Sequence, residues 1–381
     1  MLILGGLITS GISGCLRLQE ATDPNEETQT GSTGGSDVSL TESWSDPIGA
    51  SHIYVDQGKF YWNDWGAVGH ALGDVGLEWS REVTHPNIQS TGPEPAFAKQ
   101  GQYILFGFSP ENPEQGGHFH AYNRAGEELW VSEAPSDGKH NFPIDATISG
   151  DIAVVGARQK GGQLDGEQDP LVWGIDVDTG EELWAKSRDE HEMLKLGYVG
   201  SHDGDIYLGW GGGTKVLNKT DGTVIDSKDS WSITYAAWGG STGHVHGETL
   251  FACAPQGVHA YPIGTNGLEW SYSDTGWPDA PLAVDNSLVV AAADEGDIYA
   301  LERESGEERW TTSITGAVRA IDTSASHVWV GDRETGLTGY DRSTGEIVHR
   351  STQPLDGEDI AVASDELVIG GDTVTGYSIN F

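Results

Sequence analysis

An eleven-residue pattern returns along most of this 381-residue chain, and it constrains the fold more than any other feature. The clearest copies are residues 174–184 (GIDVDTGEELW), 300–310 (ALERESGEERW) and 339–349 (GYDRSTGEIVH). Weaker copies end at Trp79, Trp130, Asp226 and Trp270. The last residues of neighbouring copies lie between 39 and 54 residues apart, which is the length of one supersecondary unit. Units of this size stack side by side, so one long chain can form a single repeat domain.

Each copy predicts a β-hairpin. In residues 176–180 the aspartate can bond to the backbone of a turn, and Gly180 tolerates a positive φ. The tryptophan that follows has a large area to bury against a neighbouring sheet. Two further apolar runs precede the hairpin, for example residues 282–284 and 287–292 before the turn at Gly306. The repeated unit is therefore expected to be a sheet of four antiparallel strands.

These copies resemble the tryptophan-docking motif of pyrroloquinoline-quinone (PQQ) repeat propellers, Ala-x-Asp-x-x-Thr-Gly-Lys-x-x-Trp. The resemblance implies an all-β chain whose residues 38–381 form a β-propeller of four-stranded antiparallel blades. In such motifs the tryptophan closes the outermost strand and docks its blade. By that rule the docking residues here are Trp44, Trp79, Trp130, Trp184, Trp270 and Trp310. The motif's Lys is never kept, and Asp226 and His349 stand where Trp is expected, so these two blades should dock less well.

The two ends of the repeat region predict how the ring closes. After His349 the chain has three strand-like runs, at 360–363, 366–370 and 374–379, with no fourth. Near the other end, residues 39–45 read as an outer strand without a blade of its own. Pairing that strand with the C-terminal three removes an exposed sheet edge. We therefore expect eight blades, or seven if the weaker copies do not form complete sheets.

The first residues suggest export and a lipid anchor. A short apolar run is followed by Ile12-Ser13-Gly14-Cys15, which resembles the lipobox of bacterial and archaeal lipoproteins. That resemblance implies a signal peptide at 1–14 and a lipidated Cys15, although no Lys or Arg precedes the cysteine. Residues 15–37 are polar and small, as in a flexible linker. We expect a cell-membrane protein on the extracytoplasmic side, with Cys253 left as a small core residue.

The charge of the chain restricts its partners and its surroundings. The formal net charge is −39, from 59 acidic and 20 basic residues spread along the whole length. Nucleic acid is disfavoured as a partner, because phosphate binding needs basic patches. So many like charges repel one another unless salt screens them. The composition is typical of a halophilic source, and together with the lipobox it suggests a halophilic archaeon.

Quinone-dependent catalysis and metal binding are the two alternatives to a non-catalytic scaffold. Quinoprotein dehydrogenases share this propeller and hold PQQ with Ca²⁺, but they typically carry an adjacent cysteine pair that this sequence lacks. The pairs His118/His120 and His244/His246 each place two imidazoles on one face of a strand, where Zn²⁺ or Cu²⁺ could bind. No third ligand is identifiable. We therefore expect no catalytic residue, cofactor or metal, with a PQQ enzyme and a metal-binding propeller as the alternatives.

Two insertions depart from the repeat and suggest a binding face. Residues 109–117 and 158–169 each fall between the second and third strands of a blade, in adjacent blades. Both should leave the same face of the ring, and loops on a rigid scaffold commonly bind other molecules. The chain also looks like the non-catalytic propeller lipoprotein of the bacterial outer-membrane assembly machinery. We therefore expect a membrane-anchored scaffold for a protein or glycan partner.

Overall fold

The computed structural model describes residues 38–47, 49–56, 58–64, 67–72, 76–83, 96–108, 117–133, 141–159, 170–191, 196–210, 212–231, 233, 243–254, 257–273, 282–293, 296–332, 336–351 and 359–381. The predicted signal peptide, linker and Cys15 lie outside these residues. The described residues form strands joined by turns, together with one short helix, α1 (Arg188–His191). No helix among them is long and apolar enough to cross a membrane.

The described strands form eight four-stranded antiparallel sheets, which we number as blades in chain order. Blade 1 consists of β2 (His52–Asp56), β3 (Lys59–Asp64), β4 (Ala67–Leu72) and β5 (Gly76–Glu82), and blade 2 consists of β6 (Phe97–Gln100), β7 (Tyr103–Phe108), β8 (His118–Tyr122) and β9 (Glu128–Glu133). Blade 3 consists of β10 (Asn141–Ser149), β11 (Ile152–Gln159), β12 (Pro170–Asp176) and β13 (Glu182–Lys186), and blade 4 consists of β14 (Tyr198–His202), β15 (Asp205–Trp210), β16 (Gly213–Asn218) and β17 (Val224–Lys228).

The second half of the ring repeats this arrangement. Blade 5 consists of β18 (Gly243–His246), β19 (Thr249–Ala254), β20 (Gly257–Pro262) and β21 (Trp270–Tyr272), and blade 6 consists of β22 (Ala283–Val284), β23 (Leu288–Ala292), β24 (Asp297–Glu302) and β25 (Glu308–Ser313). Blade 7 consists of β26 (Val318–Thr323), β27 (His327–Asp332), β28 (Gly336–Asp341) and β29 (Ile347–Arg350), and blade 8 consists of β30 (Ile360–Ala363), β31 (Glu366–Ile369), β32 (Val374–Asn380) and β1 (Ser39–Asp46).

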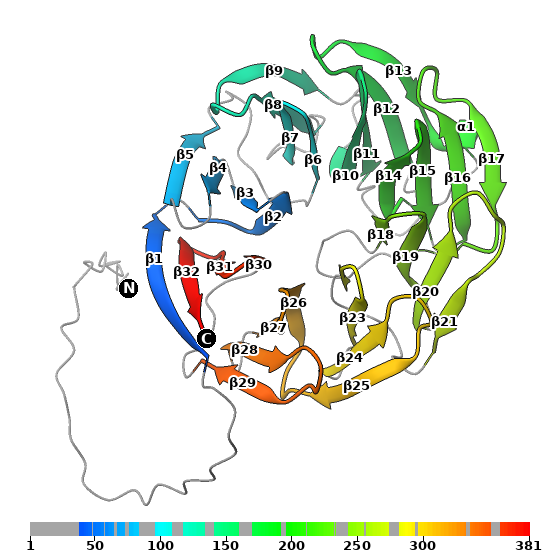
Figure 1. Cartoon of the computed structure of the whole chain (residues 1–381). Coiled ribbons are helices and arrows are strands. Elements are labelled where there is room, and N and C mark those ends of the chain that lie inside the picture. The colour runs from blue at the N-terminus through cyan, green and yellow to red at the C-terminus, as the bar shows by residue number, and fades with distance from the viewer. Residues whose placement is uncertain are drawn as a thin grey trace, which may run out of the picture. The chain divides into compact units, whose positions relative to one another are not determined.

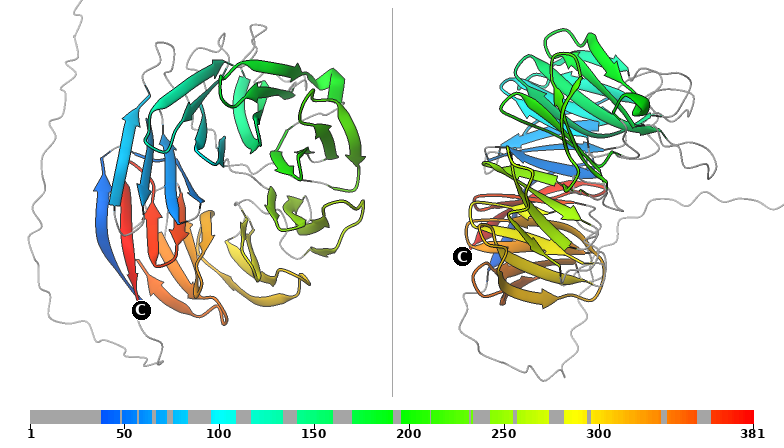
Figure 2. Two further views of the ribbon diagram at one scale, coloured as in Figure 1. Left: turned by 45° about the horizontal axis from the view of Figure 1, so that its top comes forward. Right: turned by 90° about the vertical axis from the view of Figure 1, so that its right-hand side faces the viewer.

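The blades surround a central axis as an eight-bladed β-propeller, which confirms the predicted fold (Figure 1). The first strand of each blade is innermost and the last lies at the rim. Blade 8 is closed by the antiparallel pair β1 and β32, whose register runs from Ser39 opposite Asn380 to Asp46 opposite Val374. Figure 2 shows this N-terminal strand beside the C-terminal one. The ring therefore has eight blades rather than seven.

A β-bulge precedes the docking position in the outer strands. In blade 3, Gly174 of β12 lies opposite Trp184 while Ile175 lies opposite Glu182, so Leu183 is an extra residue. The same register shift occurs in blades 1, 2, 4, 6, 7 and 8. A bulge bends the strand and re-aims the next side chain, which here is the tryptophan or its replacement. The repeat thus encodes the direction of the docking side chain as well as its chemistry.

Five of the six docking tryptophans pack on the hairpin glycine of the next blade. Trp184 donates a hydrogen bond from Nε1 to the carbonyl of Lys219 at 2.8 Å. A Cβ on Gly222, whose φ is +67°, would lie only 2.5 Å from the indole. The same indole-to-carbonyl bond joins Trp79 to Arg124, Trp130 to Val177, Trp270 to Arg303 and Trp310 to Arg342. Trp44 differs, because it donates to Glu366 in its own blade and stacks on Trp62 of blade 1.

The two blades without a docking tryptophan use other contacts. Beyond Asp226, the buried Trp231 stacks between Tyr207 of blade 4 and Tyr261 of blade 5, at centroid distances of 6.2 and 5.2 Å. Lys228 also donates a hydrogen bond to the side chain of Asn266 in blade 5. Weaker docking at blades 4 and 7 stays a prediction, and these substitute contacts act against it.

The replacement in blade 7 keeps a bond to the neighbouring blade. His349 Nδ1 lies 3.0 Å from the carbonyl oxygen of Val38, the residue before β1 of blade 8. The imidazole thus makes the same kind of contact as the indoles, a ring nitrogen on a backbone carbonyl. Its ring also tilts against Trp329 at 5.7 Å.

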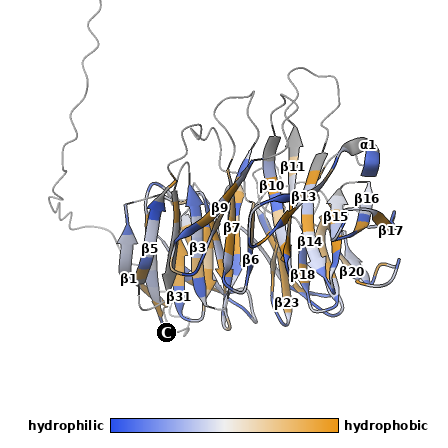
Figure 3. Cartoon of the chain, turned by 90° about the horizontal axis from the view of Figure 1, so that it is seen from above, coloured by the Kyte–Doolittle hydropathy of each residue, from blue (hydrophilic) through white to orange (hydrophobic). Residues whose placement is uncertain are grey.

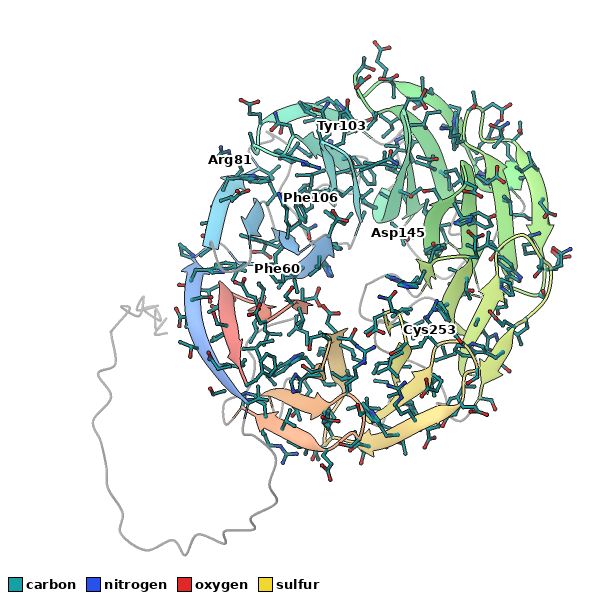
Figure 4. All side chains as sticks on the ribbon, in the orientation of Figure 1. Phe60, Arg81, Tyr103, Phe106, Asp145 and Cys253 are labelled. Carbon is teal, nitrogen blue, oxygen red and sulfur yellow. The ribbon has the colours of Figure 1, made fainter. Side chains whose placement is uncertain are left out.

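Aspartates join neighbouring blades at the inner edge of the ring. Asp145 lies toward the inside of the ring (Figure 4). Its Oδ2 accepts the backbone N–H of Val199 in blade 4, and its Oδ1 accepts that of Ala146. Asp322 does the same with Val362 and Thr323, and Asp359 with Ile53 and Ile360. The innermost strand has no partner on its channel side, so each carboxylate satisfies an N–H that the blade alone leaves open. We call these three residues the inner aspartates.

Trp184→Ala should destabilise the ring more than any nearby surface change. Removing a docked indole and its hydrogen bond is expected to cost about 3 to 5 kcal/mol. Leu183→Ala is the matched control, because Leu183 is 49 % exposed at the bulge and should change stability by less than about 0.5 kcal/mol. Urea unfolding followed by tryptophan fluorescence measures both. Equal losses for the two variants would contradict the docking role.

The carboxyl of Asp322 gives the fold a specific pH dependence. Burial raises its pKa to about 7, against hydrogen bonds from Val362 and Thr323 that lower it. The folded protein thus holds a proton between about pH 4 and 7 that the unfolded chain lacks, and stability falls as the pH rises through this window. Asp322→Asn removes the titration. Relative to wild type, this variant should gain about 3 kcal/mol between pH 5 and 8.

Asp176→Asn is the control for this titration. The hydrogen bond from the Thr179 side chain lowers the pKa of Asp176, so that carboxyl stays ionised throughout the range. Its stability difference from wild type should not change between pH 5 and 8. Urea unfolding at a series of pH values gives both differences, and the comparison cancels the titration of the rest of the chain. A flat difference for Asp322→Asn would refute the raised pKa.

Candidate functional site

The two faces of the ring carry different connections. Turns between first and second strands, and between third and fourth, share one face, which we call the tight-turn face. Connections between second and third strands, and between blades, share the opposite loop face. In blade 2 the chain leaves β7 at Phe108 and returns at His118, and in blade 3 it leaves β11 at Gln159 and returns at Pro170. Figure 3 shows the ring edge-on, with the strand ends of both faces.

This topology places both predicted insertions on the loop face of adjacent blades. The strand order β6-β7-β8-β9 and β10-β11-β12-β13 puts each insertion between a second and a third strand, as expected. Residues 109–116 and 160–169 themselves lie outside the described residues. Their anchoring strands are firmly held, since Ile104–Phe108 of β7 and Ile152–Ala157 of β11 are buried. Two insertions therefore start from rigid, neighbouring positions.

On the tight-turn face, basic side chains connect neighbouring turns. Arg342 donates to the Ser324 carbonyl at 2.7 Å and to Ser287 Oγ in blade 6 at 2.8 Å, and it also pairs with Asp285. Burial alone raises the pKa of Asp285, but the hydrogen bond from Arg342 holds it below its ordinary value. Lys219 similarly reaches back from blade 4 to the Ser149 carbonyl of blade 3, at 2.9 Å. The carbonyls of Arg342 and Lys219 accept the docking indoles, so one turn residue holds two contacts.

A shallow hollow of about 470 Å³ also lies on the tight-turn face. Its lining residues are Asn286, Ser287, Glu302, Glu304 and Ser305. Glu302 already accepts two hydrogen bonds from Arg309, at 2.7 and 2.8 Å. Every lining side chain is polar, which does not suit an apolar cofactor. The hollow adds hydrogen-bonding surface to this face.

PQQ and Ca²⁺ would need several oxygen ligands and cations on the channel wall. Ca²⁺ takes six to eight oxygen ligands, and the quinone carries three carboxylates that need cationic partners. The inner aspartates each spend both oxygens on backbone N–H groups. Lys99 of β6 is buried and paired with Asp56. The described inner strands carry one further permanent cation, Arg319 of β26, so this part of the wall does not fit the cofactor.

The histidine pairs occupy two different environments. His118 and His120 lie inside blade 2, 2 % and 1 % exposed, and His120 Nδ1 is 3.0 Å from Glu128. His244 and His246 of β18 stack at 6.5 Å, and His246 Nε2 lies 3.1 Å from the Asn286 side chain. In the described part of the chain, no three His, Cys, Asp or Glu side chains are grouped to hold a metal ion. The described residues thus supply neither pair with a third ligand.

Cys253 is unsuited to nucleophilic chemistry. It is fully buried in blade 5, and burial raises the pKa of its thiol to about 12. A thiolate is the reactive form, and so buried a thiol stays protonated at ordinary pH. Cys253 is therefore a core residue, as the sequence predicts.

The comparisons with known proteins agree with this geometry. A family model described as "Outer membrane protein assembly factor BamB" matches residues 55–278 and 230–378. BamB from Moraxella catarrhalis superposes with a TM-score of 0.64 at 17% identity, covering 89% of this chain and all of that one. The computationally designed protein Ika8 gives 0.62 at 15%, covering 88% and 98%. No curated protein matches the sequence.

An enzyme shares the same architecture. The quinohemoprotein alcohol dehydrogenase ADHIIG from Pseudomonas putida HK5 superposes with a TM-score of 0.63 at 11% identity, covering 90% of this chain and 76% of the enzyme. Identities this low show the fold alone. The family model is a different kind of match, because its two stretches cover most of the sequence after residue 54. The chain therefore belongs to the family described as outer membrane protein assembly factor BamB.

Proposed function

We propose that this protein is a membrane-anchored, extracytoplasmic propeller that binds a partner protein through its loop face and catalyses no reaction itself. The observation that carries the proposal is the position of the two long insertions. Both leave from the same face of the ring, and both start from buried strands of adjacent blades. Membership of a family described as an assembly factor supports a binding role. A glycan is the alternative partner.

The proposed location rests on the residues before the propeller. A lipid on Cys15 would tether the ring through residues 16–37, and two acyl chains hold a domain durably at a membrane. The net charge of −39 fits work in salty surroundings, where a dense ion atmosphere screens repulsion between carboxylates. A halophilic archaeal source is part of this proposal.

The proposed binding face can be tested by shortening one insertion. In one variant residues 161–168 are replaced by two glycines, and the control variant Glu304→Gln alters the tight-turn face instead. Both full-length proteins are incubated with membranes of the source cells in molar KCl, crosslinked, and analysed by mass spectrometry. We expect a partner that wild type and Glu304→Gln capture to fall at least tenfold with the shortened loop, while the unfolding temperature is unchanged. Equal capture by all three would refute the loop face as the binding surface.

A cofactor titration distinguishes the enzyme alternative. Wild type is titrated with PQQ and Ca²⁺ in molar KCl while thermal unfolding and cofactor absorbance are followed. We expect no saturable absorbance change and no rise in the unfolding temperature, because the described channel wall lacks the required ligands. Saturable binding with a raised unfolding temperature would replace the scaffold by a quinone-dependent oxidoreductase.

Salt should stabilise the folded ring strongly. Compaction brings the excess carboxylates together, and ions shorten the range of their repulsion from about 10 Å at 0.1 M to about 3 Å at 1 M. The unfolding temperature is therefore expected to rise continuously between 0.1 and about 2 M KCl. Calorimetry at each KCl concentration measures the unfolding temperature. Samples with the same molar concentration of sucrose, an uncharged solute, are the control. An unfolding temperature that stays constant or falls would remove the argument for a saline environment.

A further inference from the structure

The hairpin turn of blade 4 departs from the repeat in a way that creates a second motif. Where blades 3 and 7 have Asp-x-x-Thr-Gly, blade 4 has Asn218-Lys219-Thr220-Asp221-Gly222. The turn begins with an amide instead of a carboxylate, and a hydroxyl stands two residues later. Asn-x-Thr is the acceptor motif for N-linked glycosylation of exported proteins. It is the one Asn-x-Ser/Thr triplet in the whole sequence.

The turn holds the side-chain amide of Asn218 through its oxygen atom. Its side-chain oxygen accepts the backbone N–H of Thr220 at 2.8 Å, the role that aspartate has in the other blades. In blade 2 the equivalent Asn123 donates its amide to Glu127 at 2.7 Å. No described residue accepts a hydrogen bond from Asn218 Nδ2. The side-chain oxygen therefore holds the turn, while the nitrogen can form a bond to another group without breaking a contact within the turn.

The turn is exposed to solvent, and the strand that follows it exposes apolar side chains. Thr220 and Asp221 are exposed, and Asn218 is half-buried. The strand that follows carries Val224 and Ile225, 39 % and 52 % exposed, in one of the two blades that lack a docking tryptophan. Adjacent exposed aliphatic side chains on an outer strand favour unwanted association. A bulky polar group at the start of this strand would hinder such contacts.

We propose that Asn218 is an attachment site for an N-linked oligosaccharide, an inference that rests on the extracytoplasmic location proposed above. The donor is a lipid-phosphate-linked oligosaccharide. The bond between its anomeric carbon and the phosphate oxygen breaks, and a bond from that carbon to Asn218 Nδ2 forms. One amide proton leaves, and the lipid phosphate is the leaving group. The Thr220 hydroxyl supplies the feature that the transferase reads.

Peptide mapping of the exported full-length chain tests this. The chain is produced in cells whose exported reporter protein carries N-linked oligosaccharide, and cleavage before aspartate releases residues 205–220 as one peptide. We expect this peptide to carry added oligosaccharide mass. The signal should persist in Thr220→Ser and fall to background in Thr220→Val. Asn218→Asp adds a cleavage site before residue 218, so its products are residues 205–217 and 218–220, and both should carry no oligosaccharide. Asn218→Asp should keep the fold, because Asp176 and Asp341 occupy the same position and accept the same backbone bonds.

Protease treatment of intact cells separates the possible failures. An exported chain with an unmodified Asn218, beside a modified reporter, overturns the glycan and leaves the location standing. A chain protected inside the cell overturns the location and the glycan together. Oligosaccharide that remains in Asn218→Asp would place the modification elsewhere and refute this site.

Discussion

The contact between an indole and the hairpin glycine of the next blade holds the ring together. A single four-stranded sheet exposes two apolar faces and cannot be stable alone, so each blade depends on its neighbours. The tryptophan contributes its large face to this junction and its Nε1 to a backbone carbonyl, while the glycine permits the close approach. The bulge before the tryptophan is equally necessary, since without it the side chain would lie on the other face of the strand. One short motif thus specifies both the hairpin and the junction.

Scarce positive charge is used where it has the most structural effect. The chain has 20 basic residues against 59 acidic ones, yet Lys99, Lys219, Lys228 and Arg342 each bond across a boundary between blades. At such a boundary a cation relieves repulsion between two sheets and satisfies buried acceptors at once. The inner aspartates show the complementary use, because backbone N–H groups rather than cations bond to their carboxyl oxygens. The ring therefore tolerates its charge through placement as well as through solvent ions.

Much of the fold could be predicted from the sequence because its repeat signals are local. The spacing of the tryptophans gives the blade length, and the orphan strand around Trp44 gives the closure with β32. Trp231 could not be predicted as the junction of blades 4 and 5, since its partners Tyr207 and Tyr261 are distant in sequence and follow no pattern. The inner aspartates bond to backbone groups, which carry no sequence signature. For the candidate site, strand order predicted the face of the insertions, but the turn contacts of Arg342 depend on tertiary geometry.

The same architecture separates rigidity from recognition. On the tight-turn face the hairpin residues are held twice, by the indole on their carbonyl and by side-chain bonds to neighbouring turns, so little conformational freedom is left there. The long connections leave from the loop face instead. Sequence can therefore vary between second and third strands without disturbing the junctions that fix the blades. Loops on such a scaffold can differ while the fold stays the same, and the fold itself occurs in an assembly factor, a designed protein and a quinohemoprotein alcohol dehydrogenase.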